Sequence, residues 1–404
     1  MTETAIIGGG AAGVMAALSV SSPHMHVTIF EKKDRILKKL LATGNGRCNY
    51  TNINADISGY FGQNIEAIES VLLAFTPQDT INFFRSIGIE PKYRENGRVY
   101  PLSDQSSSVV DALRFKLAAL NCDIKTNFNT INIEKHTNKF TIYSESGEVV
   151  QADKLIITAG GMASPELGSN GSGFKLAKGF GHTITDLSPV LVQLKTDPDA
   201  IKGMQGIKME CLISAWNDTN LITQEEGELL FTDYGISGNA VFNISYIIPQ
   251  YKTLTFNIDF LPSVSMQELN NILQQRRNNL NYLTLENFLT GMINKKLGQL
   301  IIKKSGLDKL SLPVASLKNE NLENIAKEIK SYKIKILGTA GFKNAQVTAG
   351  GIPLAEINIK TLESKKVKNL YFAGEILDVF GKCGGYNLQW AWASGYIAGL
   401  NARN

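Results

Sequence analysis

The residues best suited to chemistry lie in two glycine-rich segments near opposite ends of the chain. The first, residues 8–13, reads GGGAAG, and the second, residues 370–388, contains LYFAGEILD and ends in GGYNL. Both place small residues where backbone can approach a large ligand, and both lead into a segment of helical composition. The first segment alone would predict only a bound dinucleotide. The two together predict FAD that is held by both ends of the chain.

The first segment has the spacing of a dinucleotide-binding turn. Gly8, Gly10 and Gly13 follow a short strand over residues 4–7 and open a helix that runs to about residue 20. Glycines at this spacing allow a tight turn and close approach of a pyrophosphate, and the helix N-terminus offers it free N–H groups. Glu31 follows a second strand over residues 26–30, where an acid can accept hydrogen bonds from ribose hydroxyls. A carboxylate would repel a 2′-phosphate, so Glu31 argues against NADP at this site.

Other glycine turns and polar loops leave alternatives open. Residues 159–161 (AGG) and 374–375 (GE) are either further walls of one cofactor cleft or plain turns after apolar strands. In the loop 43–52, Arg47 could pair with the pyrophosphate or with a substrate carboxylate. Cys48 in the same loop is either a reactive thiol or an inert one. The loop 96–101 (NGRVYP) is either a surface turn or a site contact, and the two tryptophans of the last helix are expected in the core.

The order of the elements predicts one α/β domain assembled from both ends of the chain. Residues 190–260 alternate polar and apolar side chains, as antiparallel strands of a small barrel or sandwich do, and SMQE at 265–268 has a capping-box pattern. A Rossmann-like FAD-binding domain is therefore expected over 1–188 and 339–404. An inserted cap over 189–338 would combine a β-barrel with a helical subdomain at about 265–310.

Composition narrows the classes of function. The 404 residues include 43% hydrophobic and 19% charged side chains, with a net charge of +4, as in an ordinary soluble globular protein. Scattered lysines argue against a nucleic-acid partner. The absence of a long apolar run and of a signal peptide predicts a cytoplasmic protein with no membrane partner. Four dispersed cysteines and four histidines lack disulfide or metal-ligand spacing, so no metal is predicted.

With these segments in view, the chain resembles the flavoprotein family called HI0933-like or YhiN-like. Some relatives in that family are named bile-acid-type enone reductases and others aminoacetone oxidases. The resemblance covers nearly the whole chain. It is carried by GGGAAG (8–13), TGNGRCNYTN (43–52), GRVYPLSDQSSSVV (97–110), TAGGMASPELGSNGSGFKLAKGFGHTI (158–184), GELLFTDYGISGN (227–239), VTAGGIPLAEINIKTLESKKVKNLYFAGEILD (347–378) and GGYNLQWAWASG (384–395). It implies a two-dinucleotide-binding-domain flavoprotein fold with an inserted barrel-plus-helical cap, and non-covalent FAD.

The resemblance also implies a set of cofactor contacts, carried over motif by motif. The pyrophosphate would meet Gly8, Gly10, Ala11, Ala12 and Gly13, and the adenosine ribose would meet Glu31. The flavin side would be lined by Arg47, Cys48 and Asn49, and a cofactor wall would be formed by Ala159 and Gly160. The ribitol and pyrophosphate would face Gly374 and Glu375, and the isoalloxazine would meet Tyr386, Asn387 and Leu388. The predicted cofactor set is completed by Lys32, Ile131 and Gly385.

The chain departs from the family pattern at three positions. Asp233 and Asn239 stand where LFTHxGxSGP is usual, replacing its His and its Pro, and Cys383 stands where Thr is common. If the His acts on substrate in relatives, Asp233 puts that chemistry in doubt here. The catalytic residue is left unknown, with Arg47 and Tyr386 as candidates.

The expected activity is hydride transfer between flavin N5 and a small organic substrate. No second GxGxxG is present, so a nicotinamide donor would dock transiently, or the substrate itself would reduce FAD. We favour NAD(P)H-driven reduction of an activated C=C or C=O bond over oxidation of a small amine or amino ketone by oxygen. A further alternative is structural FAD with an RNA- or protein-binding cap, for which an Arg-rich or aromatic stripe over residues 265–335 would be expected. Substrate, electron donor, catalytic acid or base, and oligomeric state do not follow from the sequence.

Overall fold

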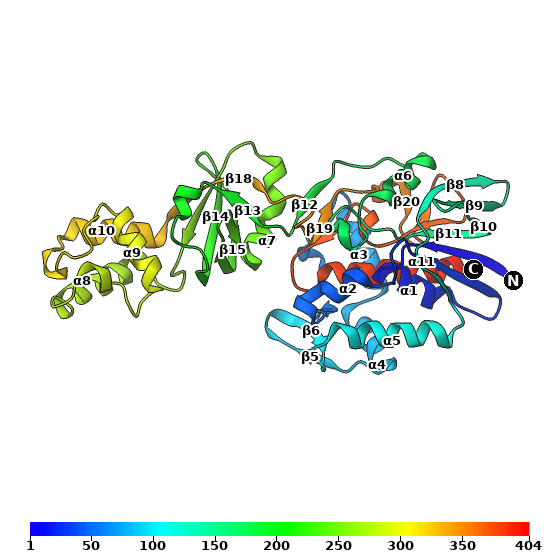
Figure 1. Ribbon diagram of the computed structural model, residues 1–404, viewed down its shortest axis with the longest axis horizontal. Helices are drawn as coiled ribbons and strands as arrows, with labels where there is room; N and C mark the ends of the chain where they lie inside the picture. The colour runs from blue at the N-terminus through cyan, green and yellow to red at the C-terminus, as the bar shows by residue number, and fades with distance from the viewer. Residues whose placement is uncertain (404) are drawn as a thin grey trace. The chain divides into compact units, whose positions relative to one another are not determined.

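The computed structural model describes residues 1–403. The chain divides into two compact units, one joining Met1–Val190 to the segment from Phe342 onward, the other formed by Leu191–Gly341. Each unit has its own cluster of buried hydrophobic side chains. The first unit thus contains both glycine-rich segments (Figure 1).

The first unit is built around a seven-stranded sheet with the order β20-β21-β22-β11-β1-β2-β7. Its parallel strands are β1 (Thr2–Ile7), β2 (Met25–Phe30), β7 (Asp123–Lys125), β11 (Lys154–Ile157) and β22 (Leu370–Phe372), and its antiparallel edge is β20 (Ile357–Asn358) with β21 (Glu363–Ser364). The central strands are buried along most of their length, as parallel strands covered on both faces must be. This sheet confirms the predicted Rossmann-like class.

Helices α1 (Ala11–Val20) and α11 (Tyr386–Arg403) pack closely along one another. Small residues allow this approach, because a Cβ at Gly395 would lie 2.4 Å from the Ala12 carbonyl oxygen and one at Gly399 2.3 Å from that of Ala16. Trp390 and Trp392 of α11 are buried, as expected. The last helix therefore lies directly beside the helix that the first glycine turn opens.

The rest of the first unit surrounds these elements. A three-stranded sheet, β8 (Thr130–His136), β9 (Lys139–Ser144) and β10 (Val149–Ala152), contacts β1 and β11. A second, β3 (Thr51–Asn52), β6 (Arg98–Pro101) and β5 (Pro91–Tyr93), joins the two polar loops singled out in the sequence. The helices are α2 (Lys38–Ala42), α3 (Ile65–Ala74), α4 (Pro77–Ser86), α5 (Ser106–Ala119) and α6 (Ser172–Gly179), and the paired short strands are β4 (Tyr60–Phe61) with β23 (Phe380–Gly381) and β12 (Ser188–Val190) with β19 (Val347–Ala349).

The second unit contains a closed six-stranded barrel and a group of helices (Figure 1). The barrel strands are β13 (Leu194–Thr196), β16 (Gly235–Ser237), β15 (Asn220–Phe231), β14 (Lys208–Asn217), β17 (Leu254–Asp259) and β18 (Tyr332–Thr339), joined by α7 (Asn239–Ile244). Buried residues alternate with more exposed ones along β17 and most of β18, and the buried side chains are those of Leu254, Phe256, Ile258, Tyr332, Ile334 and Ile336. The helices are α8 (Met266–Asn279), α9 (Lys295–Lys304) and α10 (Asn319–Lys330).

The structure answers several local questions that the sequence raised. The Ser265 hydroxyl accepts from the Glu268 N–H, and the Glu268 carboxylate accepts from the Ser265 N–H, so the capping box forms. The last helix begins at Tyr386, which places Tyr386 and Asn387 in its first turn. Of the two predicted alternatives, a small barrel or a sandwich, the structure has a closed barrel.

No helix within residues 1–403 combines the length and the apolar character that crossing a bilayer would require. In the same residues, no three His, Cys, Asp or Glu side chains are grouped so that they could hold a metal ion.

Candidate cofactor site

The first glycine turn has a distinct steric reason for each glycine. Gly8 has φ +107°, and a Cβ there would lie 2.7 Å from the Thr158 carbonyl oxygen. A Cβ at Gly13 would lie 2.0 Å from the Gly8 carbonyl oxygen. Gly10 is different, because a Cβ there would meet no protein atom within 4 Å, and no side chain caps the N-terminus of α1. The open space at Gly10 therefore faces free N–H groups of α1, which fits a phosphate.

Glu31 lies beside this turn, directly after β2. One of its carboxylate oxygens accepts from the Gly9 N–H at 2.8 Å, and the other from the Lys33 N–H at 2.8 Å. The Phe128 N–H donates to the Glu31 carbonyl, so the segment that leads into β8 lies beside Glu31, and Ile131, the second residue of β8, has an exposed side chain. The Lys32 ammonium donates to the Asn170 side chain at 2.5 Å, and a Cβ at Gly168 would lie within 4.0 Å of both the Lys32 and the Glu31 side chains.

The second end of the chain meets the first at Gly374. A Cβ at Gly374, which has φ +82°, would lie 2.8 Å from the Ala12 side chain, and the Gly374 N–H donates to the Ser394 hydroxyl. Ala159 lies against the first turn as well, since a Cβ at Gly8 would come within 2.9 Å of its Cα. The turns at 8–13, 159–160 and 374 therefore come together at the carboxyl ends of β1, β11 and β22, where ligands bind in open α/β sheets.

Two side chains in this region, those of Lys39 and Thr348, were not predicted from the sequence. Lys39 donates to the Glu375 carboxylate at 2.9 Å and to the Ala163 carbonyl at 3.2 Å. Glu375 also accepts from the Thr348 N–H, and the Thr348 hydroxyl accepts from the N–H groups of residues 162 and 163. This cluster fixes Glu375 against the loop after β11. Lys39 lies four residues before the loop 43–52, but nothing in the sequence distinguishes it from Lys38.

The loop 43–52 meets the start of α11. A Cβ at Gly385, which has φ +102°, would lie 2.5 Å from the Thr51 carbonyl oxygen, and the Asn52 amide donates to the Gly384 carbonyl at 2.8 Å. Asn49 is buried, and its Oδ1 has no hydrogen-bond partner among the described residues. A buried polar atom without a partner is costly. Asn49 therefore fits a site whose ligand supplies the missing donor.

The α11 side chains are engaged by protein groups. The Tyr386 hydroxyl donates to the Asn54 carbonyl at 3.0 Å, and the Asn387 amide both accepts from the Gly381 N–H and donates to its carbonyl. These contacts fix the first turn of α11. Leu388 is half-buried against the core of this unit.

The thiol and phenol of this region carry protons at neutral pH. Cys48 is fully buried, and burial raises the pKa of its thiol to about 12. Burial also raises the pKa of the Tyr386 hydroxyl above its usual value. Of the two alternatives for Cys48, the structure supports the inert thiol, because the thiolate is the nucleophile.

Arg47 and the family departures have separate surroundings. The Arg47 Nε donates to the Gly44 carbonyl at 3.1 Å, and its guanidinium lies 5.4 Å from the centre of the Tyr100 ring. In the barrel unit, Asp233 is exposed in the turn before β16. Asn239 opens α7, and its side chain accepts from the Glu228 N–H at 2.6 Å, so its role there is structural.

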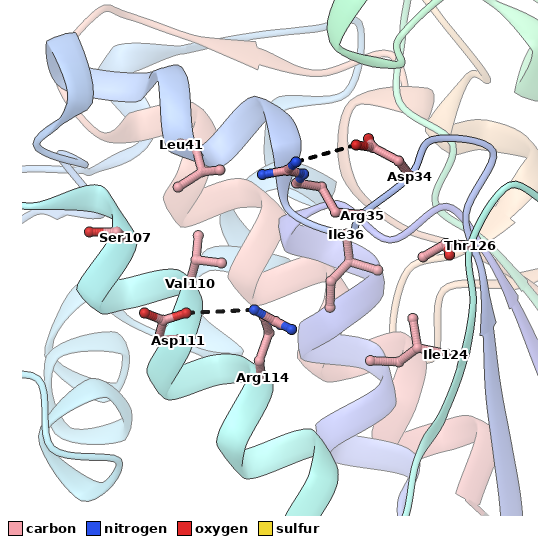
Figure 2. Close-up of a pocket in the computed structure, with 10 residues that line it drawn as sticks. All are labelled: Asp34, Arg35, Ile36, Leu41, Ser107, Val110, Asp111, Arg114, Ile124 and Thr126. Carbon is pink, nitrogen blue, oxygen red and sulfur yellow. Dashed lines mark hydrogen bonds and ion pairs between the residues drawn. The ribbon is translucent and has the colours of Figure 1, made fainter.

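A cavity of about 540 Å³ lies between α5 and the end of β7 (Figure 2). None of the predicted cofactor contacts lines it, although Ile36 of its wall also packs against Gly9. Arg35 pairs with the adjacent Asp34, and Arg114 with Asp111 one turn earlier on α5. Its charged groups are therefore paired locally, and the cavity lies outside the region where the glycine turns meet.

Comparison with known proteins gives this geometry a family. The family model of the HI0933-like protein Rossmann domain matches residues 2–401. The chain belongs to the HI0933-like family of flavoprotein oxidoreductases. It is 39% identical to a 3-dehydro-bile acid delta(4,6)-reductase of Clostridium scindens, over 100% of this chain and 99% of that protein. It is 30% identical to a ribosomal RNA dihydrouridine synthase of Escherichia coli, over 98% of this chain and 96% of that protein.

The fold has a counterpart among solved structures. The 3-ketosteroid delta1-dehydrogenase of Sterolibacterium denitrificans, solved with 1,4-androstadiene-3,17-dione, is 11% identical, with a TM-score of 0.52 and coverage of 100% of both chains. At this identity the likeness shows the fold alone. The family match and the fold together confirm the predicted Rossmann-like FAD domain with an inserted barrel.

Proposed function

We propose that this protein is an FAD-dependent reductase that adds hydrogen across a C=C bond conjugated to a carbonyl group, with NAD(P)H as electron donor. The observation that carries the proposal is the meeting of the three glycine turns beside α1 and α11, in one unit of a chain that matches both relatives over nearly their full lengths. The names of these relatives describe one chemistry. A delta(4,6) 3-dehydro steroid and a uracil ring each contain a C=C bond conjugated to a carbonyl.

The reaction balances as one hydride and one proton added to the substrate. The hydride goes to the carbon β to the carbonyl, and the proton to the α carbon, while NAD(P)H becomes NAD(P)⁺. Bound FAD would supply the hydride-transfer chemistry. The chain's own part would be to bind it through Gly10 and the α1 N-terminus, to hold Glu375 through Lys39, and to present Tyr386, whose hydroxyl donates to the Asn54 carbonyl, as a candidate contact. Arg47 remains the second candidate contact.

The test is an anaerobic titration of the purified protein with NADH and NADPH, following the visible flavin absorbance. Rapid bleaching, followed by reoxidation on addition of a 3-oxo-Δ4 steroid or another conjugated enone, is the expected result. The proposal would be contradicted if dithionite bleaches the flavin absorbance of the protein but neither NADH nor NADPH does. In that case, oxygen uptake with small amines or amino ketones tests the oxidase alternative.

A second candidate substrate is a uracil within RNA. Residues 265–335 hold twelve Lys and Arg against six Asp and Glu, a net charge of +6, whereas residues 191–264 hold four against nine, a net charge of −5. Basic surface of this kind attracts a phosphate backbone. The exposed cations are lysines, at positions 295, 296, 303, 304, 309, 318, 327, 333 and 335.

Two features weigh against the RNA candidate. Arg276 donates to the carbonyls of Phe288 and Thr290, and Arg277 donates to that of Leu317, so both arginines tie α8 to neighbouring loops. Of the aromatic residues in this segment, Phe288 and Tyr332 are buried and Tyr282 is exposed. NADPH-dependent formation of dihydrouridine in isolated ribosomal RNA would favour this candidate, and turnover of steroid enones alone would favour the small-molecule substrate.

A further inference from the structure

One face of the β5–β6–β3 sheet gathers four basic side chains, and two of them lie over a single aromatic ring. In the register of the sheet, Lys92 lies opposite Tyr100, and Arg98 lies two residues before Tyr100 on the same strand face. The Arg94 N–H bonds to the Arg98 carbonyl, and the Arg94 guanidinium lies 4.9 Å from the centre of the Tyr100 ring. Arg47 covers the same ring at 5.4 Å. We call Arg47, Lys92, Arg94 and Arg98 the basic face.

The acids near the basic face do not neutralise it. Asp104 accepts from both Lys92 and Arg94, the latter at 2.7 Å, so one carboxylate is shared between two cations. Glu95 is exposed in the turn between Arg94 and Arg98, and forms no ion pair within residues 1–403. Arg98 as a whole residue is half-buried, yet no side chain or backbone group of the described residues accepts a hydrogen bond from its guanidinium. A guanidinium without a protein acceptor fits an anionic ligand.

The basic face lies next to the start of α11. A Cβ at Gly384 would come within 3.2 Å of the Arg98 Nε, and Asn52, opposite Arg98 in the sheet, donates to the Gly384 carbonyl. Gly384 has φ +116°, a conformation that side chains rarely adopt, and it precedes Tyr386 by two residues. The face therefore adjoins the residues that we assign to the isoalloxazine end of the cofactor.

We propose that the basic face binds a phosphate group of a nucleotide that docks beside the flavin, with Arg98 as its principal contact. The guanidinium plane of Arg98 suits bidentate contact with phosphate oxygens, and Arg47 and Arg94 are held in place by Tyr100. Two nucleotides carry such a phosphate in a form that fits the proposed function: NADPH at its 2′ position, and RNA in its backbone. The inference rests on the proposed reductase function only in naming NADPH or RNA as the molecule that carries the phosphate.

The experiment measures binding to the FAD-loaded protein by calorimetry, with 2′,5′-ADP, 5′-AMP and a short uridine-rich RNA as probes. The variants are Arg98→Gln and Arg94→Gln, with Arg114→Gln as matched control, because Arg114 is an exposed arginine that pairs with Asp111 on its own helix. If the carrier is NADPH, wild type binds 2′,5′-ADP at least about tenfold more tightly than 5′-AMP, and Arg98→Gln abolishes the difference. If the carrier is RNA, Arg98→Gln weakens RNA binding about tenfold while the two mononucleotides bind alike.

Two outcomes would overturn the inference. One is unchanged binding of every probe by Arg98→Gln and Arg94→Gln. The other is a loss of FAD affinity in these variants that matches the loss of probe binding, because the face would then serve the cofactor itself. Failure of the reductase proposal can be distinguished from failure of this inference. If only the reductase proposal is wrong, wild type still binds a phosphate probe through Arg98, although neither NADH nor NADPH bleaches its flavin.

Discussion

At the residue scale, the glycines of the first turn are required for different reasons, and only the structure shows which reason applies to each. The spacing of Gly8, Gly10 and Gly13 predicts the turn, but spacing cannot say which glycine is required by the protein and which by the ligand. A Cβ at Gly13 would collide with the Gly8 carbonyl, whereas one at Gly10 would enter open space. The role of Lys39 could not be predicted from the sequence, because it depends on an ion pair with Glu375, 336 residues away.

Gly13→Ala and Gly10→Ala should therefore fail in different ways. We expect Gly13→Ala to destabilise the apoprotein by about 1–3 kcal/mol, because the new methyl group has no room. Gly10→Ala should leave apoprotein stability unchanged and weaken FAD binding roughly tenfold or more, since it obstructs a hydrogen bond to a charged group worth about 1.5–3 kcal/mol. Thermal unfolding of the apoproteins and FAD titration measure the two effects. Equal stability losses in both apoproteins would contradict this division.

Lys39→Met tests the cluster that fixes Glu375. The variant leaves the Glu375 carboxylate with only the Thr348 N–H, and we expect about 1 kcal/mol lower stability together with weaker FAD binding. Lys38→Met is the control, because Lys38 is the adjacent residue and pairs with Asp34 at 2.9 Å instead. FAD titration and thermal unfolding of both variants measure the difference. If the two variants bind FAD alike, Lys39 has no role in positioning Glu375 for the cofactor.

At the element scale, long patterns were predictable and short strands were not. The helix after Gly10 follows a recognisable glycine turn, and the helix after Ser265 begins with a recognisable capping box. The strands β3, β5 and β6 have two to four residues within polar, glycine-bearing loops, so no period could be read. Burial of Tyr50 and Val99 holds these short strands in place, which is a tertiary effect. The basic face was therefore not predictable as a unit.

The edge hairpin β20–β21 is tied to the segment after α6 by a buried histidine, and this tie should make stability depend on pH. His182 bonds to the Glu356 carboxylate and the Ser364 hydroxyl, each at 2.7 Å. Burial lowers the pKa of His182. Burial would raise the pKa of Glu356, but hydrogen bonds from Lys366, Thr183 and His182 outweigh it and lower that pKa to about 2.

Both shifts act in the same direction. A depressed folded-state pKa means that the unfolded chain binds more protons, so stability falls as pH falls. The His182 contribution is lost from about pH 6.5 downward, and that of Glu356 from its unfolded value near 4.5 down to about 2. We expect the Tm to fall between pH 7 and pH 4, and to fall less in the double variant His182→Gln, Glu356→Gln. An identical dependence of Tm on pH in the double variant and in wild type would show that these hydrogen bonds do not cause the loss of stability at acid pH.

At the scale of the whole molecule, the two motif-bearing ends predicted a discontinuous domain, and every residue of the candidate cofactor site lies in that one unit. The chain leaves and re-enters this unit through neighbouring antiparallel strands, because Val190 of β12 pairs with Val347 of β19. A short linker can therefore join Val190 to Phe342 without crossing the sheet. What the sequence could not supply is the set of contacts between distant loops, such as Thr51 with Gly385, which exist only after the sheet has formed.

Replacing residues 191–341 by a short Gly–Ser linker should leave a folded protein that binds FAD, because the unit has its own core and its own sheet. The protein should be yellow and reducible by dithionite, because every residue of the candidate cofactor site lies in the retained unit. Removal of residues 384–403 instead should abolish FAD binding, because α11 packs along α1 and Gly385 contacts the loop 43–52. Absorbance and circular dichroism distinguish the two deletions. A colourless, unfolded product of the first deletion would mean that the inserted unit is needed for the cofactor domain to fold.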